Sequence, residues 1–562
     1  MINGENWRRS CLQNVNVRIN GIMARTVAVI GAGASGLTAI KCCLDEGLEP
    51  TCFERSDCIG GLWHYSEKVK EGHTTVMRNT IANVSKEFTA YSDFPPPVTQ
   101  PIYMHNKDFE EYLKLYANKF DLKKHIQLEK EVVRIYETDD HEVTGRWNVK
   151  VKDISSNNVD VFTFDAVLIC TGVFSEPNIP KYPGLDQFKG KLIHTHAYKD
   201  ARGFDDKNVV VVGIGNSAID AACDISHVSR QVYVSSRNGS WILGRLSKYG
   251  QPIDMTMISR FMYTLLTFFP SLLNKLMMKQ CNTKIDHFQY GINPKYTPAR
   301  SSSTVNDQLP YMLLIGAIKM KPDIKCFYDN DIEFVDGTRV NNVDAVVFGT
   351  GYLPKFPFLD TSVFGEDKTQ LYLTMFPPDR QKQQTIAVIG CFRIKGPLLP
   401  IAEMQSRLAT RVFKGKVSLP NRTVMYKDIE KQKLLSKEKR VYSLQAVSQL
   451  DFFPYMDQLA GMIGCRPNFW KMFLTDLALA VQCVFGPGTS YQFRLVGPGS
   501  WAGAREAIFT QWDRTYYTLS EGKQKTFKPR RRNKLKLFLF VCLVSVVFTA
   551  IYKYDVFEIY KQ

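Results

Sequence analysis

Two glycine-rich loops, each placed directly after a short apolar run, constrain the fold of this 562-residue chain more than any other feature. The first reads Gly31-Ala-Gly-Ala-Ser-Gly36, and the second reads Gly213-Ile-Gly-Asn-Ser-Ala218. A strand, a G-x-G-x-x-G/A turn and a helix together form the unit that holds a dinucleotide in Rossmann-type folds. The sequence therefore predicts an α/β protein with two dinucleotide-binding, Rossmann-like domains.

The first loop separates a predicted strand at Thr26–Ile30 from a helix predicted over Leu37–Leu44. Its first glycine permits the tight turn, its second lets the backbone approach a pyrophosphate, and Gly36 lets the helix pack closely on the strand. The pyrophosphate is expected at the helix N-terminus, where free N–H groups favour an anion. Glu54 follows the next predicted strand, at the distance where a carboxylate accepts a hydrogen bond from a ribose hydroxyl.

The second loop keeps Gly213 for the turn and Gly215 for the approach to a pyrophosphate. Ala218 replaces the third glycine, which is a permitted change because that position governs only helix packing. No acid follows the next predicted strand, and Arg237 stands there instead. An arginine pairs with a 2′-phosphate through charge-assisted contacts, whereas an acid would repel it. The second site is therefore predicted to prefer NADP(H), and the two sites together suit hydride transfer between a nicotinamide and a flavin.

The chain is too long for one hydrophobic core, so at least two domains are expected. Two later apolar runs, Asp165–Gly172 and Asp344–Tyr352, are both predicted to return the chain to the first sheet. The second dinucleotide domain would then be inserted in the first. The expected order is an N-terminal extension at 1–23, the first part of the first domain at 24–175, the inserted domain at 176–343 with a helical insertion at about 241–310, the rest of the first domain with its cap at 344–520, and a basic segment with a hydrophobic anchor at 521–562.

The net charge of +17 is partly local. Eight cations between residues 523 and 536 stand directly before the apolar run Leu537–Tyr552, and no basic patch interleaves with aromatics as a nucleic-acid groove would. The run reaches roughly 24 Å as a helix, against a hydrocarbon core of about 30 Å. It is predicted to anchor the chain in a membrane, either spanning a thin bilayer or lying partly embedded, with the body held in the cytosol. A buried terminal helix is the alternative.

Two further features bear on location and chemistry. The apolar stretch Ile258–Met278, broken at Pro270, indicates either an ordinary core helix pair or a patch resting on a membrane surface. The 13 cysteines are odd in number and lack metal-ligand spacing, so free thiols in a reducing compartment and no metal site are expected.

The segment Phe188-Lys-Gly-Lys-Leu-Ile-His-Thr-His-Ala-Tyr198 matches the FxGxxxHxxxY signature of flavin-containing monooxygenases. From Met23 onward the chain resembles this family, in its animal type that includes the N-oxide-forming dimethylaniline monooxygenases. The other motifs that carry the resemblance are Gly60–Trp63, Asn83–Glu87, Ser235–Trp241, Gln405–Arg407 and Tyr491–Gly499.

The resemblance implies an enzyme in which NADPH reduces FAD and O₂ then forms a C4a-hydroperoxyflavin. Soft nucleophilic nitrogen or sulfur in lipophilic amines and sulfides would attack its terminal oxygen. The cofactor carries this chemistry, so no Ser/His/Asp set is required. The resemblance also implies an endoplasmic reticulum membrane location with the catalytic domains facing the cytosol, contact with membrane lipid through the C-terminal tail, and a homodimer as one assembly it allows.

Asn83 matches the family's active-site asparagine, which would hold the nicotinamide ribose and the flavin edge. From the residues alone, Asn83 with Ser85 and Glu87 would instead suggest a helix cap. His194 and Tyr198 are interpreted as structural residues of a linker. The residues implied to line FAD are Gly31, Ala32, Gly33, Ala34, Ser35, Glu54, Leu62, Trp63, Asn83 and Val84. Those implied to face NADP are Ala82, Asn83, Ser217, Ala218, Ile219, Asp220 and Arg237.

The sequence departs from the family pattern in two places. The usual Phe-Ala-Thr-Gly-Tyr has Gly349 at its second position, and the lost methyl is expected to soften the strand slightly. Val173-Phe174 stands where many members carry histidines.

The alternative activities are Baeyer–Villiger oxygenation of carbonyl compounds and NADPH oxidase activity on the same fold. The Baeyer–Villiger signature ends in Trp followed by Pro or Asp, whereas Tyr198 is followed by Lys199 here. A disulfide reductase would need a CxxC pair at the flavin, and a non-catalytic scaffold would not need both loops and Asn83 intact.

Overall fold

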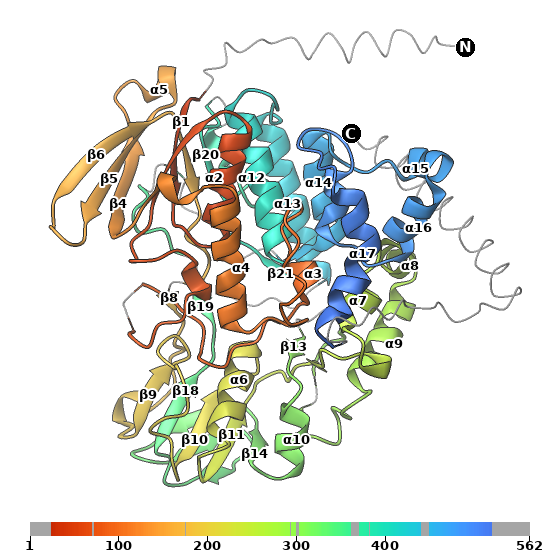
Figure 1. Cartoon of the computed structure of the whole chain (residues 1–562). Helices are drawn as coiled ribbons and strands as arrows, with labels where there is room; N and C mark the ends of the chain where they lie inside the picture. The colour runs from red at the N-terminus through yellow and green to blue at the C-terminus, as the bar shows by residue number, and fades with distance from the viewer. Residues whose placement is uncertain are drawn as a thin grey trace, which may run out of the picture.

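The computed structural model describes residues 24–519 except 70–71, 175, 293, 299–302, 354, 361–362, 364–369, 381–382 and 440–448. The extension predicted at 1–23 and the basic segment and anchor predicted at 521–562 lie outside the described residues. Two five-stranded sheets dominate the molecule, one in the upper part of Figure 1 and one at its lower end.

The first sheet has the order β20-β7-β1-β2-β3, and its paired strands are all parallel. Its strands are β1 (Thr26–Ile30), β2 (Glu49–Phe53), β3 (Ile126–Gln127), β7 (Ala166–Ile169) and β20 (Ile386–Val388). The central strand β1 leads through the first glycine loop into α2 (Ala34–Asp45). The predicted strand–loop–helix unit is therefore present, and the loop lies at the carboxyl end of the sheet.

The second sheet repeats this plan in the order β14-β11-β10-β18-β9. Its strands are β9 (Lys191–His194), β10 (Asn208–Val212), β11 (Gln231–Ser235), β14 (Ile318–Lys321) and β18 (Ala345–Phe348), and all of its pairs are parallel. The second glycine loop joins β10 to α6 (Asn216–Ile225). The signature segment supplies the edge strand β9, whose His194 is in register with Phe348.

One predicted strand belongs to a different sheet from the one expected. The run at 344–352 was predicted to return the chain to the first sheet, but β18 pairs with β10 and β9 in the second sheet. The first sheet is completed instead by β20, which pairs with β7. The chain passes between the two units through an antiparallel pair formed by β8 (Glu176–Pro177) and β19 (Tyr352–Leu353).

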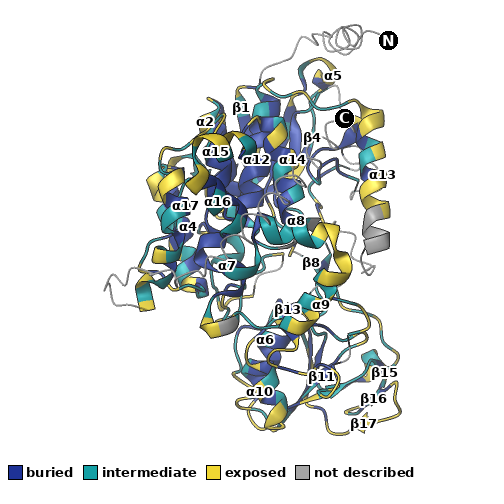
Figure 2. Cartoon of the chain, turned by 90° about the vertical axis from the view of Figure 1, so that its right-hand side faces the viewer, coloured by how far each residue is buried: buried dark blue, intermediate teal, exposed yellow. Residues whose placement is uncertain are grey.

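Each unit has three layers because alternate residues of a strand face opposite sides of a sheet. Val27 and Val29 of β1 pack into a core with helices α2, α4 (Asn106–Lys119), α12 (Leu399–Phe413) and α14 (Phe452–Ile463). Ala28 and Ile30 face the antiparallel sheet of β4 (Lys130–Glu137), β5 (Trp147–Asp153) and β6 (Val159–Phe164). The second unit has helices on one face and β15 (Ile324–Phe327), β16 (Ile332–Phe334) and β17 (Arg339–Val340) on the other. Figure 2 shows buried residues concentrated between these layers.

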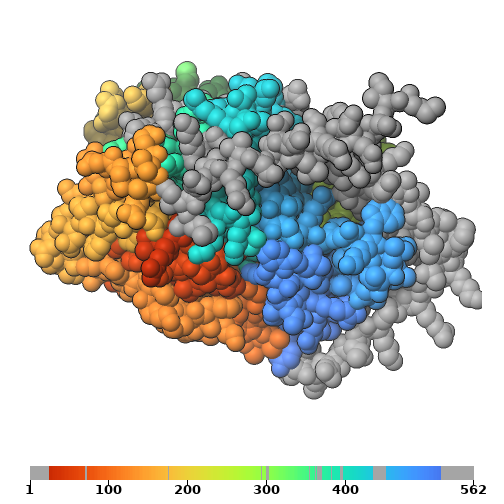
Figure 3. Space-filling view, turned by 90° about the horizontal axis from the view of Figure 1, so that it is seen from above, coloured from red at the N-terminus to blue at the C-terminus, as the bar shows by residue number. Residues whose placement is uncertain are grey.

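The C-terminal part of the described chain packs against the first unit, as the view from above shows (Figure 3). It comprises α15 (Phe469–Thr475), α16 (Leu477–Phe485), α17 (Ala504–Tyr516) and the 3-10 turn η6 (Ser490–Arg494). Helix α13 (Arg422–Lys439) precedes it and contributes Met425 and Ile429 to the core of the first unit. At its buried contact with the first unit, the Tyr491 hydroxyl and the Arg514 guanidinium both donate to Glu87, which follows the predicted active-site asparagine by four residues.

The helical insertion forms α7 (Ile253–Met257), α8 (Arg260–Phe268) and α9 (Pro270–Cys281). Pro270 begins α9, so the predicted break in the apolar stretch is confirmed. Helix α8 packs on α16, which joins the insertion to the C-terminal helices. Within the described residues, no helix combines the length and the apolar character needed to cross a bilayer.

Candidate functional site

The first glycine loop forms a tight cradle at the end of β1. A Cβ atom on Gly36 would lie 1.8 Å from the Gly31 carbonyl oxygen, so only glycine allows α2 to start this close to the strand. Gly31 has a φ of +100°, which favours glycine over residues with a side chain. The predicted roles of these two glycines therefore have a direct geometric basis.

The helices behind both loops present free N–H groups at their first turns. Helix α2 begins after Gly33 and α6 begins after Gly215, and neither residue offers a side-chain cap. Neither helix has an acidic residue in its first turn. An uncapped helix N-terminus without a neighbouring carboxylate favours a phosphate group, so both cradles fit the pyrophosphate of a dinucleotide.

Glu54 lies beside the first loop, as predicted. Its Oε2 accepts from the Ala32 backbone N–H at 2.7 Å, and its Oε1 accepts from the backbone and the hydroxyl of Ser56 at 2.9 and 2.7 Å. The carboxylate is buried. These bonds orient Glu54 at the edge of the cradle, where a ribose hydroxyl can donate to its remaining lone pairs.

Leu62 and Trp63 are brought to the same loop by backbone contacts. Gly60 donates to the Ala32 carbonyl at 3.1 Å and pairs with Gly33, which places the 3-10 turn η1 (Gly61–Trp63) over the cradle. Trp63 stacks on Phe109 of α4, with ring centroids 3.7 Å apart. The structure therefore gathers this predicted set around the first loop.

The second cradle contains a complementary pair of small residues. A Cβ on Gly349, at the end of β18, would lie 2.3 Å from the Ala218 methyl. The methyl missing at position 349 therefore makes room for the alanine that replaces the third glycine of the fingerprint. Ala218 and Ile219 are fully buried, whereas Gly215 and Ser217 are exposed at the helix start and are the residues that a nucleotide can reach.

Asp220 faces the insertion. Its Oδ1 accepts from Asn306 Nδ2 at 2.9 Å, and burial raises its pKa. A second bond, from the Val305 N–H to Asn216 Oδ1 at 2.8 Å, ties the same segment to the start of α6. The insertion is thus fastened to the helix that begins at the second cradle.

Arg237 is exposed at the rim of an open pocket of about 990 Å³. Two neighbouring segments add further cations to this wall, namely Lys295 from one and Lys319 and Lys321 of β14 from the other. The Lys321 carbonyl accepts from the Ser236 N–H, so β14 lies beside the segment of Arg237. This Arg237 pocket has the positive charge that a 2′-phosphate requires.

Asn83 lies in a half-buried segment between the two units. Ala82 donates to the Met104 carbonyl and belongs to the buried cluster that contains Ala32. Ser85 is the residue before helix α3 (Lys86–Thr89), and its side chain makes no capping bond, so the helix-cap interpretation of this segment is not supported.

Arg245, which sequence reasoning missed, holds this segment from the inserted unit. Its Nη2 donates to Asn83 Oδ1 at 2.8 Å and to the Ile81 carbonyl at 3.2 Å, and its Nε donates to the Ala82 carbonyl at 3.1 Å. Because a guanidinium only donates, the Asn83 atom it contacts is the oxygen. The Nδ2 group of Asn83 therefore remains available as a donor.

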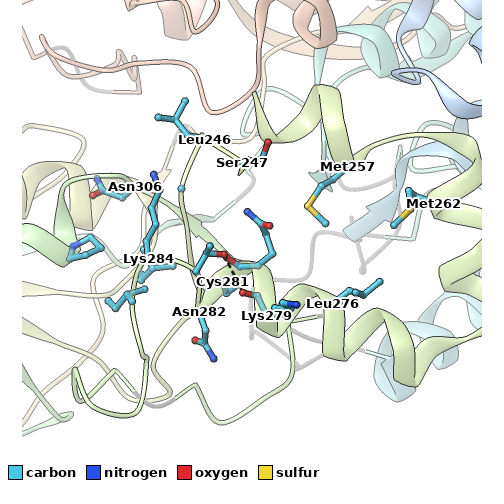
Figure 4. Close-up of a pocket in the computed structure, with 16 residues that line it drawn as sticks. Leu246, Ser247, Met257, Met262, Leu276, Lys279, Cys281, Asn282, Lys284 and Asn306 are labelled. Carbon is cyan, nitrogen blue, oxygen red and sulfur yellow. Dashed lines mark hydrogen bonds between the residues drawn. The ribbon is translucent and has the colours of Figure 1, made fainter. Parts of the chain in front are cut away.

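A second pocket, of about 770 Å³, borders the insertion. Met257, Met262 and Leu276 lie at one end and Lys284 and Asn306 at the other (Figure 4). Gly244 and Leu246, the neighbours of Arg245, contribute to its wall. This insertion pocket is mainly apolar and adjoins the residue that holds Asn83.

The signature residues have structural partners. Tyr198 donates to Asp224 of α6 at 2.6 Å, and Asn79 of the first unit donates to the other oxygen of Asp224 at 3.1 Å. His194 Nδ1 accepts from the His196 N–H, and burial lowers the pKa of His194 to about 4, which makes it a poor proton donor near neutral pH. These contacts match the interpretation of both residues as parts of a linker.

Two cradles of this geometry define an α/β protein that binds two dinucleotides, and the comparisons agree with that class. A model of the flavin-binding monooxygenase-like family matches residues 24–553. Flavin-containing monooxygenase 5 of Mus musculus is 44% identical over 87% of this chain and 92% of its own length. The N-oxide-forming dimethylaniline monooxygenase 2 of Mus musculus is 42% identical over 92% of this chain and 94% of its own.

Among solved structures, S-allyl-L-cysteine S-oxygenase from Allium sativum shares the fold with a TM-score of 0.61 at 23% identity, over 88% of this chain and 98% of that one. The chain therefore belongs to the flavin-binding monooxygenase-like family, and it is an enzyme of the flavin-containing monooxygenase class.

Proposed function

We propose that this protein is an NADPH- and O₂-dependent monooxygenase that transfers oxygen to soft nucleophilic nitrogen or sulfur in lipophilic small molecules. The observation that carries the proposal is the placement of Asn83. Its segment packs with the first cradle through Ala82, and its side chain is held by Arg245 of the inserted unit. The asparagine amide thus lies where ligands of the two units would meet.

The residues present fit the two cofactors in different ways. The first cradle, with Glu54 at a ribose position and Trp63 nearby, fits FAD. The second cradle, with Arg237 and the neighbouring lysines, fits NADPH through its 2′-phosphate. When bound, FAD reduced by NADPH supplies the activation of O₂ that places one oxygen atom on the substrate.

The protein's own contribution is orientation and the exclusion of water. The bond from Arg245 to Asn83 Oδ1 holds the amide and leaves its Nδ2 group free to donate to groups bound in the cradles. The mainly apolar insertion pocket offers a lipophilic molecule a site next to this segment. A soft nucleophile needs no general base to attack an electrophilic oxygen, so this set of residues is sufficient.

Product analysis tests the proposal. The purified enzyme is offered a tertiary amine, a sulfide and a ketone side by side with NADPH and air. An N-oxide and an S-oxide are expected, and the names of two relatives, an N-oxide-forming monooxygenase and an S-oxygenase, point the same way. A lactone or ester from the ketone as main product would favour Baeyer–Villiger oxygenation, and hydrogen peroxide alone would favour an NADPH oxidase.

The proposal includes an endoplasmic reticulum membrane location with the catalytic units in the cytosol. Exposed apolar side chains gather on α8, α9 and α15–α16, which lie along one side of the molecule in Figure 1. They are Phe268, Phe269, Leu272, Met278, Leu474 and Leu477. Helix α17, the last α-helix of the described chain, contacts α16 of this apolar face.

Vesicle flotation tests the membrane part. The full chain is expected to float with phosphatidylcholine vesicles, a chain ending at residue 520 to float less, and that shorter chain with Phe268→Ser and Phe269→Ser to stay in the dense fraction. Phe268 and Phe269 are 50% and 57% exposed, so each can bury roughly half of the about 150–250 Å² that a whole aromatic side chain offers. Equal flotation of all three proteins would contradict the proposed contact.

A further inference from the structure

The short helix that follows Asn83 lacks a cap of its own. Ser85 precedes α3, and its side chain makes no capping bond. In a capping box, the third helical residue is a Glu or Gln that accepts from the N–H of the capping residue. Here the third helical residue is Phe88, which has no acceptor. The backbone N–H of Ser85, two residues past Asn83, must therefore find a partner elsewhere in the fold.

Asp254 of the insertion supplies that partner. Its Oδ2 accepts from the Ser85 N–H at 2.6 Å, across 169 residues of sequence. Its Oδ1 accepts from the Met255 N–H at 2.9 Å, and the Tyr103 hydroxyl approaches it at 3.5 Å. Asp254 is buried, with 4% of its surface exposed, so these bonds are shielded from water. Its carboxylate takes the place of the Glu or Gln that α3 lacks at its third position, and it comes from another part of the chain.

The rest of α3 is already anchored by other elements. Arg514 and Tyr491 hold Glu87, and Lys86 donates to the Val98 and Gln100 carbonyls at 2.9 and 2.6 Å. On the other side of Asn83, Arg245 holds residues 81–83. Residues 84 and 85 lie between the segment that Arg245 holds and the part of α3 that these contacts hold. The bond from the Ser85 N–H to Asp254 fixes this connecting stretch.

We propose that Asp254 is a positioning residue for Asn83. By fixing the Ser85 N–H, it sets the backbone that carries the asparagine amide and keeps Nδ2 directed toward the cofactor groups. This inference rests on the proposed role of Asn83. It makes the helical insertion, rather than the glycine loops, the element that controls how well the asparagine shelters the bound cofactors.

Hydrogen exchange and coupling efficiency test this inference in the FAD-loaded protein. Asp254→Ala removes the acceptor, and Asp254→Asn keeps one acceptor oxygen for Ser85. Asp457→Ala is the matched control, because Asp457 accepts two bonds from Arg260 and also ties the insertion to the body of the protein. The readouts are amide exchange in residues 83–89 and the fraction of consumed NADPH that ends as hydrogen peroxide.

Asp254→Ala is expected to speed exchange in residues 83–89 roughly tenfold, as the loss of a buried hydrogen bond would, and to raise the peroxide fraction. Asp254→Asn keeps one acceptor oxygen but turns its NH₂ group toward one of the two backbone N–H donors, so it should fall between the wild type and Asp254→Ala in both readouts. Asp457→Ala should leave residues 83–89 unchanged. Wild-type exchange in Asp254→Ala, or an equal increase in Asp457→Ala, would overturn the inference. So would an Asp254→Asn protein as impaired as Asp254→Ala.

The inference and the proposed function can fail separately. Exchange does not require turnover, so a wild-type enzyme that oxygenates none of the probes would refute the function and leave the exchange comparison valid. If Asp254→Ala does not fold, the wild-type protein still gives an answer through exchange resolved to the single amide of Ser85. Slow exchange there supports the bond to Asp254, and exchange at the rate of an exposed amide would refute it.

Discussion

The Ala218 methyl occupies the space that a side chain at Gly349 would need. Taken one at a time, each position departs from the usual pattern, since an alanine stands in the fingerprint and a glycine stands in the strand. By sequence pattern alone, the alanine is a tolerated replacement and the glycine is a slight weakening of the strand. The structure shows that the two changes fit each other across the interface between α6 and β18.

Gly349→Ala is therefore expected to destabilise the protein by about 1–3 kcal/mol, the usual cost of overpacking a core. The double variant Ala218→Gly/Gly349→Ala removes the contact with the methyl but leaves the new Cβ 2.8 Å from the Cα of residue 218, so it should recover only part of that loss. Urea unfolding of the two single variants and the double variant measures the coupling. Additive effects would show that the two methyls do not compete for one space.

Arg237 carries the predicted preference for the phosphorylated nucleotide. Arg237→Ala should weaken NADPH binding roughly tenfold or more, the value of a hydrogen bond between charged groups, and leave NADH binding nearly unchanged. Titration of flavin reduction with each nucleotide measures both affinities. Lys319→Ala is a suitable control at the same pocket wall, and a larger loss there than at Arg237 would reassign the contact.

Among the elements, the glycine loops, their strands and the break at Pro270 could be predicted from local pattern. The placement of β18 could not. An apolar run followed by glycine has the same appearance whether it joins the first sheet or the second, because strand neighbours are chosen by tertiary pairing. Arg245 escaped prediction for a related reason. Its partners Ile81, Ala82 and Asn83 lie more than 160 residues away in the sequence, and nothing local marks it.

The segment after β9 contains a buried lysine that links the two units. Lys199 Nζ donates to the Thr75 hydroxyl at 2.6 Å, and burial lowers its pKa to about 8 from an ordinary value of 10.5. Between these two values the unfolded chain binds the proton more tightly, so the folded state gains stability as the pH rises through this window. Below pH 8 the full cost of burying the ammonium group is present.

Lys199→Met removes that cost along with the bond to Thr75. The difference in Tm, variant minus wild type, is therefore expected to fall as the pH rises from about 7 to about 10, because only the wild type gains from losing the proton. Thermal unfolding of both proteins across this range gives the slope. A difference independent of pH would mean that Lys199 keeps an ordinary pKa in the folded protein.

At the scale of the whole molecule, two similar three-layer units contact each other at several places, among them the segment that carries Asn83. The chain passes between them through β8 and β19, and Tyr198, Asp224 and Asn79 bridge them on the side of the signature. The two dinucleotide units and most residues of the first cradle were predictable, because glycine fingerprints report local geometry. The contacts made by the insertion were not, since they depend on how separate segments pack.

The central claim is that the joined units transfer one oxygen atom from O₂ to a nitrogen or sulfur atom. The most direct measurement is turnover of a tertiary amine under ¹⁸O₂, with NADPH consumption and product mass followed together. The account predicts an N-oxide that carries one ¹⁸O atom for each NADPH oxidised. Unlabelled product, or NADPH oxidation that yields only labelled hydrogen peroxide, would contradict it.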